Sequence, residues 1–317
     1  MTRRFTLFSL CCALFLTMTL ASCQKFKGSQ TVPAYIHIES ISLECDYDTY
    51  GANSTNITDA WVFVDDQIIG CFELPATFPV LQKGKHKVSV YGGICVDGIG
   101  ATRSYNIFYM PKEYEGLNLV EDSIINLNPV VTYYPIGEGV NLAWKEDFET
   151  SNSLVATTDS DTSLIRMHGS EAWQSNNSFY SGEIVLPPDS LDFTVATSEE
   201  LDFYSGLNGI YSILEMDYKC NDDFFVGVMY FKGGKLTKHP LLQVVPTDTL
   251  NEKPQRWNKI YVNIGPIINA NDDATYFKLY FTSDLSANAD YGEPEYVPLN
   301  KQRYFYFDNL KLLYRQQ

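Results

Sequence analysis

Short apolar runs that alternate with polar residues recur along this 317-residue chain, separated by clusters of Gly, Pro, Asn and Asp. Val88 and Val90, for example, alternate with Lys87 and Ser89, which is the period-two pattern of a strand with one buried face. Aromatic residues make up 14% of the chain, and aromatic and β-branched residues are enriched in strands. The pattern predicts an all-β protein.

The second half of the chain predicts a two-sheet sandwich, because its strands are short and turn residues follow each one. We expect strands at 163–167, 179–186, 191–196, 211–220, 223–231, 240–245, 257–264, 275–282 and 303–313. Phe277, Leu279 and Phe281 should share one buried face of their strand. Near the C-terminus, Phe307 and Leu310 have opposite parity, so a bulge is expected at Asp308-Asn309.

The first half predicts a smaller β-sandwich. Strand residues cluster at 36–43, 61–64, 68–70, 87–91 and 117–134, with a corner at 75–79 and a glycine-rich loop at 92–100. The Pro/Gly cluster at 135–139 marks a boundary. We therefore predict a small β-sandwich domain at 31–137 and a larger jelly-roll β-sandwich at 138–317.

The N-terminus has the features of an export signal. Arg3 and Arg4 precede an apolar run that is too short and too interrupted to span a membrane comfortably, and small residues precede Cys23. The tetrad Leu20-Ala21-Ser22-Cys23 resembles the lipobox of bacterial lipoproteins. This resemblance implies removal of the signal peptide 1–22, acylation of Cys23 with palmitate-type chains, and a polar tether at 23–30. The alternative is an ordinary secretory signal that leaves Cys23 a plain thiol.

Gln24 is not the aspartate that retains some lipoproteins at the inner membrane, so the resemblance favours the outer membrane, on either face. Without residues 1–22 the chain has 21 basic and 39 acidic side chains, a net charge of −18. Such a charge excludes nucleic acid as an expected partner, because phosphates would be repelled. The expected partners are the membrane, through the lipid, and either a glycan or another envelope protein.

The mature chain has four cysteines besides Cys23, namely Cys45, Cys71, Cys95 and Cys220. Their compartment allows a disulfide, and buried free thiols are the alternative. No Cys-x-x-Cys pair or Cys/His spacing indicates a zinc site.

A set of residues in the first domain resembles the small modules called PEGA domains: Val62, Val64, Asp65, Asp66, Gly70, Pro75, Gly84, His86 and Val88. The resemblance implies a spacer or an interaction platform without catalysis. Gln67 replaces a glycine that is frequent in that family, so a different hairpin turn is expected. We interpret His86 as a residue beside a turn rather than a metal ligand, because a metal site needs several convergent ligands.

Three segments of the second domain together resemble jelly-roll carbohydrate-binding modules: 146–149, 257–262 and 306–312. In that family the opening acids and the final aspartate often hold a structural calcium, which would correspond to Asp147, Glu149 and Asp308. The alternative is that Asp308-Asn309 only bonds its own backbone at a strand bend.

One polar segment has the composition of a sugar-binding loop. Sugar recognition needs an aromatic face for stacking and amide groups for the hydroxyls. The candidate residues are Trp173 as platform, with Gln174, Asn176, Asn177 and Tyr180 beside it. The alternative is that Trp173 packs over the sandwich edge. Trp144 and Trp257 are expected in the core.

Glu215-Met216-Asp217 resembles the start of a glycosidase motif, but the closing glutamate is missing, since Tyr218, Lys219 and Cys220 follow. No other hydrolase or phosphate-binding motif is present. The sequence therefore predicts a non-catalytic, lipid-anchored envelope protein that binds glycan through its second domain. The alternative is an envelope assembly or protein-interaction lipoprotein with no sugar ligand.

Overall fold

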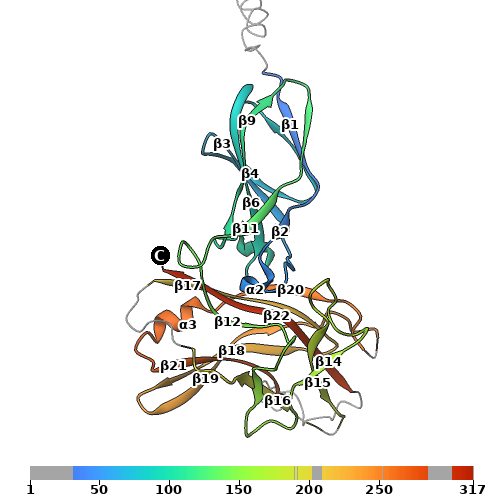
Figure 1. Cartoon of the computed structure of the whole chain (residues 1–317), viewed down its shortest axis with the longest axis vertical. Helices are drawn as coiled ribbons and strands as arrows, with labels where there is room; N and C mark the ends of the chain where they lie inside the picture. Colours follow the sequence, from blue (N-terminus) through green and yellow to red (C-terminus); the bar gives the residue numbers. More distant parts are fainter. Residues whose placement is uncertain are drawn as a thin grey trace, which may run out of the picture.

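The computed structural model describes residues 31–188, 190, 192–201, 209–251, 253–284 and 302–316, and this part of the chain is all-β. The predicted signal peptide and Cys23 lie outside the described residues. Figure 1 shows two bodies stacked along the long axis, with the described chain beginning at the far end of the upper one. No helix among the described residues is long and apolar enough to cross a membrane.

The first body consists of one five-stranded sheet and two three-stranded sheets around a shared core. The five-stranded sheet has the order β4 (Gln67–Glu73), β3 (Asp59–Val64), β6 (Gly84–Cys95) and β7 (Arg103–Tyr105), and β9 (Lys112–Leu119) also pairs with β6. One small sheet is β10 (Ile124–Leu127), β1 (Ala34–Ile38) and β5 (Ala76–Val80). The other is β2 (Ser42–Glu44), β11 (Val130–Tyr133) and β8 (Tyr109–Met110). Two short helical turns, α2 (Tyr47–Tyr50) and η2 (Gly100–Thr102), lie between strands.

Two local expectations in this body are wrong. The segment expected as a corner at 75–79 contains strand β5, and β6 continues through Gly92 and Gly93 where a loop was expected. Gly93 is needed inside the strand because β3 approaches closely. A Cβ atom there would lie 2.7 Å from Asp59 Cβ and 2.9 Å from the Trp61 ring. Glycine in a strand can therefore indicate a close approach rather than a loop.

The hairpin between β3 and β4 turns on Asp65 and Asp66, which both have positive φ (49° and 63°). Two such residues make a type I′ turn, which aspartate tolerates better than most side chains. His86 Nδ1 lies 2.6 Å from an Asp65 carboxylate oxygen, and Nε2 lies 3.0 Å from the Lys83 carbonyl. Hydrogen bonding to that carboxylate raises the pKa of His86. The histidine holds the turn in place.

The second body is a two-sheet β-sandwich, as predicted. One sheet has the order β14 (Ile165–His168), β15 (Tyr180–Leu186), β22 (Arg303–Gln316), β17 (Ile210–Cys220) and β20 (Asn258–Asn263), and β12 (Asn141–Glu146) also pairs with β22. The other sheet is β13 (Leu154–Ala156), β16 (Asp192–Thr197), β21 (Tyr276–Asp284), β18 (Phe224–Lys232) and β19 (Lys235–Val244). A short helix, α3 (Gly265–Ala270), follows β20. Phe277, Leu279 and Phe281 lie in the core between the sheets, as their parity predicted.

The predicted bulge in the last strand is present. Glu215 pairs with Lys311 and Asp217 with Asp308, so β17 advances by two residues where β22 advances by three. Asn309 has a φ of 49°, which places the extra residue in the left-handed region. Phe307 and Leu310 therefore both point into the core.

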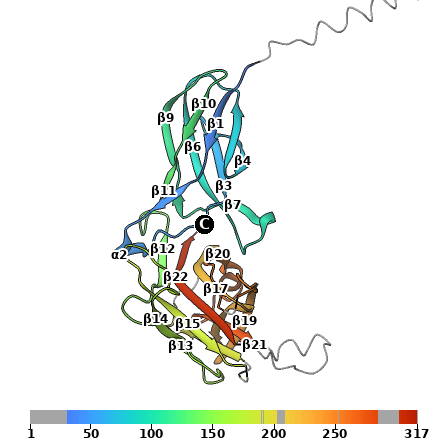
Figure 2. The same cartoon turned by 90° about the vertical axis from the view of Figure 1, so that its right-hand side faces the viewer.

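The first body rests on the outer face of the six-stranded sheet (Figures 1 and 2). Its hydrophobic core includes three residues of that face, Ile213, Tyr261 and Leu313. Backbone contacts continue across the junction, because the Asp97 amide donates to the Tyr261 carbonyl at 2.7 Å. The four described cysteines are free thiols, and only Cys220 is buried.

Candidate functional site

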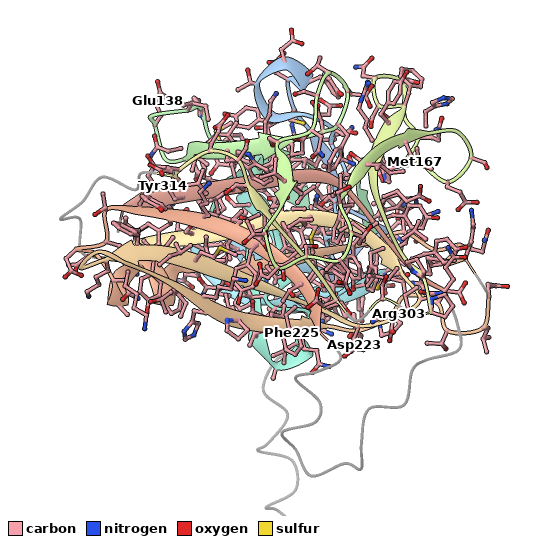
Figure 3. All side chains as sticks on the ribbon, turned by 90° about the horizontal axis from the view of Figure 1, so that it is seen from below. Glu138, Met167, Asp223, Phe225, Arg303 and Tyr314 are labelled. Atoms are coloured by element: carbon pink, nitrogen blue, oxygen red, sulfur yellow. The ribbon has the colours of Figure 1, made fainter. Side chains whose placement is uncertain are left out.

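The hollows on the described surface that are large enough to hold part of a ligand include three that lie on the sandwich or at its junction with the first body. We call them the edge groove (about 420 Å³), the acidic cleft (about 460 Å³) and the face hollow (about 270 Å³). Figure 3 views the sandwich along the long axis of the molecule. In it, Met167 of β14, the strand beside the edge groove, and Phe225 of the face hollow lie on different sides of the sandwich.

The edge groove lies where β14 and β15 meet the loop that joins them. It is lined by His168, Gly169, Ser170, Gln174, Phe179 and Tyr180. The register of the two strands places His168 directly opposite Tyr180, and their rings meet edge to face with centroids 5.6 Å apart. The other aromatic residue, Phe179, is 49% exposed.

Glu149 fixes the start of β15 beside this groove. Its carboxylate accepts hydrogen bonds from the amides of Phe179 (2.7 Å) and Tyr180 (2.8 Å). The Arg166 guanidinium stacks on the Tyr180 ring, 3.6 Å from its centroid, and also donates to the carbonyls of Phe148 and Glu149. Arg166 therefore covers one face of the Tyr180 ring, whereas the Phe179 side chain remains exposed to solvent.

The structure brings only two of the five predicted sugar-binding residues into this groove. Gln174 and Tyr180 line it, and the Gln174 side-chain amide donates to the Gly169 carbonyl at 3.0 Å. Trp173 does not line the groove. Its backbone amide donates to the Ser181 hydroxyl at 2.9 Å, and its side chain is half-buried. Asn176 and Asn177 are exposed but do not line it either.

Sequence reasoning missed His168 and Phe179. Phe179 belongs to the segment with sugar-binding composition but is not among its candidate contacts, and nothing near His168 in sequence indicates a site. Only the pairing of β14 with β15 brings His168 against Tyr180. Strand pairing of this kind is set by long-range contacts.

The acidic cleft contains two of the three carboxylates predicted to hold calcium. Asp147 and Glu149 line it together with Tyr47, Asp48 and other residues near the junction of the two bodies. Burial, and then the negative charges of Asp147 and Glu149, raise the pKa of Tyr47. The Asp147 carboxylate accepts the amide hydrogen of Glu149 at 3.1 Å.

The third carboxylate, Asp308, is fully buried, and the pKa of its carboxyl is raised mainly by burial. One oxygen accepts from the Ser181 hydroxyl (2.5 Å) and the other from the Asn309 amide (2.6 Å). Within the described ranges, no group of three or more Asp, Glu, His or Cys side chains is arranged to hold a metal ion. Asp308 thus bonds the backbone at the bend of β22, and the structural calcium stays a prediction.

The face hollow lies on the outer face of the five-stranded sheet of the sandwich, which is the face turned away from the first body. It is lined by Asp159, Asp192, Thr194, Phe225, Lys238, Pro240, Tyr280 and Thr282. The Tyr280 ring covers Gly227 of the neighbouring strand, where a Cβ atom would come within 2.4 Å of the ring. Burial raises the pKa of Tyr280 to about 12. Lys238 and Asp159 form a 2.6 Å ion pair across the hollow.

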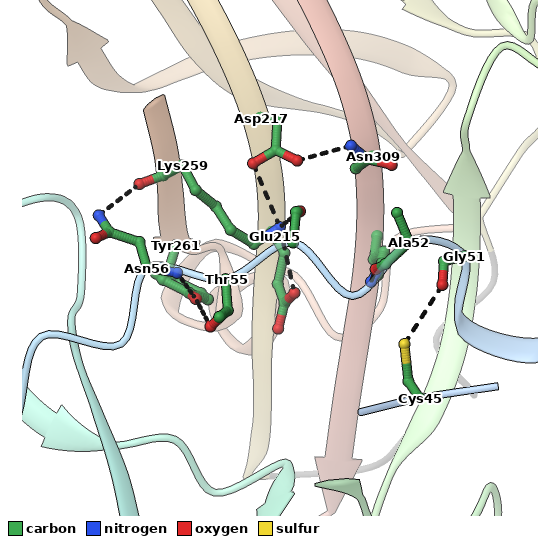
Figure 4. A network of polar contacts seen from close by, with 12 residues as sticks. Cys45, Gly51, Ala52, Thr55, Asn56, Glu215, Asp217, Lys259, Tyr261 and Asn309 are labelled. Carbon is green, nitrogen blue, oxygen red and sulfur yellow. Dashed lines mark hydrogen bonds and ion pairs between the residues drawn. The ribbon is translucent and has the colours of Figure 1, made fainter. Parts of the chain in front are cut away.

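Glu215 and Asp217 lie on the opposite face of the sandwich, beneath the first body, and both are buried (Figure 4). The hydroxyls of Tyr109 and Tyr133 donate to the Glu215 carboxylate at 3.2 and 2.8 Å. Lys259 Nζ lies 3.7 Å from an oxygen of each carboxylate. This pair is therefore part of the contact between the two bodies.

Lys311 and Trp257 also lie on this outer face of the sandwich. Lys311 Nζ donates to the Ala52 carbonyl at 2.6 Å. Trp257 was expected in the core but is half-buried on the outer side, where Lys219 Nζ lies 5.4 Å from its ring centroid. Trp144 is in the core, as expected.

Comparisons with known proteins show similarity to this chain only among solved structures, at the level of the fold. No family model matches the sequence, and no curated protein matches it. A xylan-binding domain of carbohydrate-binding family 22 has 13% identity and a TM-score of 0.34, covering 55% of this chain and 94% of its own. A family 11 carbohydrate-binding module from a Clostridium thermocellum cellulase has 12% identity and a TM-score of 0.34, with the same coverage. At these values the matches do not say what this chain binds, so its function rests on its own geometry.

Proposed function

We propose that this chain is a non-catalytic, lipid-anchored protein of the outer membrane that binds glycan in the edge groove. The observation that carries the proposal is the exposed Phe179 ring beside the Gln174 amide and the His168 imidazole in one open groove. An aromatic face covers the apolar C–H surface of a sugar ring, while amide and imidazole groups bond its hydroxyls. This combination suits an uncharged polyhydroxylated ligand.

The anchor is the second part of the proposal. It is supported by the lipobox-like tetrad ending at Cys23 and by the beginning of the described chain at the end remote from the sandwich (Figure 1). A lipid at Cys23 would leave the edge groove free to meet a ligand. Labelling with a palmitate analogue tests this part, since replacing Cys23 with serine should abolish incorporation.

A non-catalytic role is supported by the state of Glu215 and Asp217. Both carboxylates are buried and held by Tyr109, Tyr133, Lys259 and Asn309, so neither reaches a substrate. Glycoside hydrolysis needs two carboxyl groups on either side of an accessible bond.

Glycan binding is tested with the mature chain carrying Cys23→Ser, screened on a glycan array and then by calorimetry. Phe179→Ala should weaken the affinity about tenfold or more, because the stacking surface is lost. Gln174→Ala should also weaken it. Ile165→Ala is a matched control, since Ile165 is 52% exposed on β14 outside the groove.

The face hollow supplies the competing location on the same sandwich. If Phe225→Ala abolishes binding while Phe179→Ala leaves it unchanged, the site belongs to the hollow. If no glycan binds, the sugar part of the proposal is wrong. The envelope assembly role without a sugar ligand then takes its place.

A further inference from the structure

Four apolar side chains are exposed at the end of the first body where the described chain begins. Val32 is 45% exposed, Leu81 63%, Val120 49% and Ile124 62%. Together we call them the apolar tip. Val32 precedes β1, Leu81 follows β5, Val120 follows β9 and Ile124 begins β10.

Backbone pairing brings these four positions together. Ala34 pairs with Val80 on one side of β1, and Tyr35 pairs with Ile124 on the other. The Asp122 amide donates to the Pro33 carbonyl at 3.0 Å. Lys83 and Glu121 form a 3.4 Å ion pair between the loops that carry Leu81 and Val120. The apolar tip is thus one surface made from separate segments.

The tip is not explained by the core beneath it. Val80 and Leu119 are each 1% exposed and complete the interior, yet each is followed by a second apolar residue, Leu81 or Val120, that points outward. Strand alternation places polar residues at such outward positions. Single exposed apolar residues are ordinary, whereas a group at one end of a molecule suggests a partner.

The position of the tip in the chain indicates which partner. Eight residues separate Val32 from Cys23, and the nine steps between these two positions span only about 30 Å even when fully extended. Figures 1 and 2 show that the described chain starts at this end, with the sandwich at the other. A lipid on Cys23 therefore holds the tip close to the bilayer.

We propose that the apolar tip docks on the bilayer that holds the lipidated Cys23, so that the molecule stands with its sandwich away from the membrane. This inference rests on the proposed lipidation. Four partly exposed side chains give weak attraction alone, but a short tether makes the second contact intramolecular and raises its effective concentration.

Several charges near the tip are compatible with this contact because they form ion pairs, although the exposed Asp122 has no ion pair among the described residues. Besides Lys83 with Glu121, Asp66 lies 3.7 Å from Lys87 and Asp65 lies 2.6 Å from His86. Paired charges cost less to bring toward an apolar surface than isolated ones. The partner expected from this chemistry is the lipid surface itself, without a requirement for anionic headgroups.

The test uses full-length lipidated protein in phosphatidylcholine vesicles that contain brominated acyl chains, which quench nearby tryptophan. Leu81→Trp places a reporter on the tip, and Leu236→Trp is the control, because Leu236 is 46% exposed on β19 of the sandwich. We expect quenching of the reporter at 81 and none of the one at 236. Adding Val120→Asp and Ile124→Asp to the tip reporter should reduce its quenching to the control level.

Two outcomes would overturn the inference separately from the proposed anchor. If the protein floats with the vesicles but the reporter at 81 is not quenched, the anchor stands and the docking is wrong. If the Cys23→Ser chain forms a dimer that Leu81→Asp abolishes, a second copy occupies the tip instead. If wild-type protein does not float with vesicles at all, both the anchor and the docking fail.

Discussion

The two outer faces of the sandwich follow the same strand alternation but have opposite environments. On the six-stranded sheet, Glu215, Asp217, Lys259 and Lys311 point outward and are nevertheless buried under the first body. On the five-stranded sheet, Lys238 and Phe225 point outward and border a hollow. Alternation determines which side chains point away from the core, but the first body determines which of them are exposed to water.

This difference in environment changes how much each charged side chain contributes to the stability of the fold. A buried charge needs an oppositely charged or hydrogen-bonding partner, because the protein interior solvates charges poorly. Removing that partner leaves the remaining charge uncompensated. An exposed pair is screened by water and contributes little. Substitutions of the same residue type should therefore change the free energy of unfolding by different amounts on the two faces.

The largest effect is expected for Glu215→Ala. Loss of this carboxylate leaves Lys259 with less compensation and two tyrosine hydroxyls without an acceptor, so the free energy of unfolding should fall by about 3–5 kcal/mol. Urea denaturation measures it. Asp159→Ala is the control on the open face and should change stability by under about 1 kcal/mol. Equal losses for the two variants would contradict the comparison.

The next effect concerns Lys311, whose pKa is lowered to about 8, first by burial and then by the charge of Lys259. Between that value and the ordinary lysine pKa of 10.5, the unfolded chain binds a proton that the folded chain lacks. This group therefore makes the free energy of unfolding increase with pH, by about 2 kcal/mol from about pH 7.5 to about pH 9.5.

Lys311→Met tests that contribution, because methionine keeps the length of the side chain without the charge. Its stability should lack this rise, so the free energy of unfolding of wild type should increase relative to that of the variant as the pH increases. Above about pH 10 the buried Tyr109 and Tyr133, whose pKa values are raised by burial, oppose the trend. A difference that stays constant across the window would show that Lys311 remains charged.

A smaller effect is expected for Gly227→Ala on the open face. The added Cβ would lie 2.4 Å from the Tyr280 ring and 2.6 Å from the His239 carbonyl, so the ring has to leave the sheet surface. We expect a loss of about 1–3 kcal/mol in thermal or urea unfolding. Gly100→Ala is the matched control, since nothing lies within 4 Å of its added Cβ. No loss at position 227 would mean that the ring moves freely.

The local pattern of apolar and polar residues was enough to predict most strands of the sandwich. The bulge at Asp308-Asn309 follows from neighbouring residues, and the structure contains it. The strand at 275–282 also has its predicted inward face. These features depend on turn chemistry and on parity, both of which are properties of a short stretch.

The candidate site was only partly predictable, because its geometry depends on distant segments. Gln174 and Tyr180 were recognised from composition, whereas His168 joins them through strand pairing. Trp173 lies outside the groove, and its backbone amide donates to the Ser181 hydroxyl, a contact that composition does not reveal. No local signal shows that the first body would cover Glu215, because that contact joins segments over 80 residues apart.

The smallest effect is expected for the ion pair between Lys238 and Asp159, whose side chains are 40% and 61% exposed. The hydrogen bond from Lys238 lowers the pKa of Asp159 to about 2, but water screens the pair and limits its contribution. A double-mutant cycle with Lys238→Ala and Asp159→Ala should give a coupling of about 0.2–1 kcal/mol that decreases with added salt. A coupling as large as the loss from Glu215→Ala would mean that the open face is as shielded from water as the covered one.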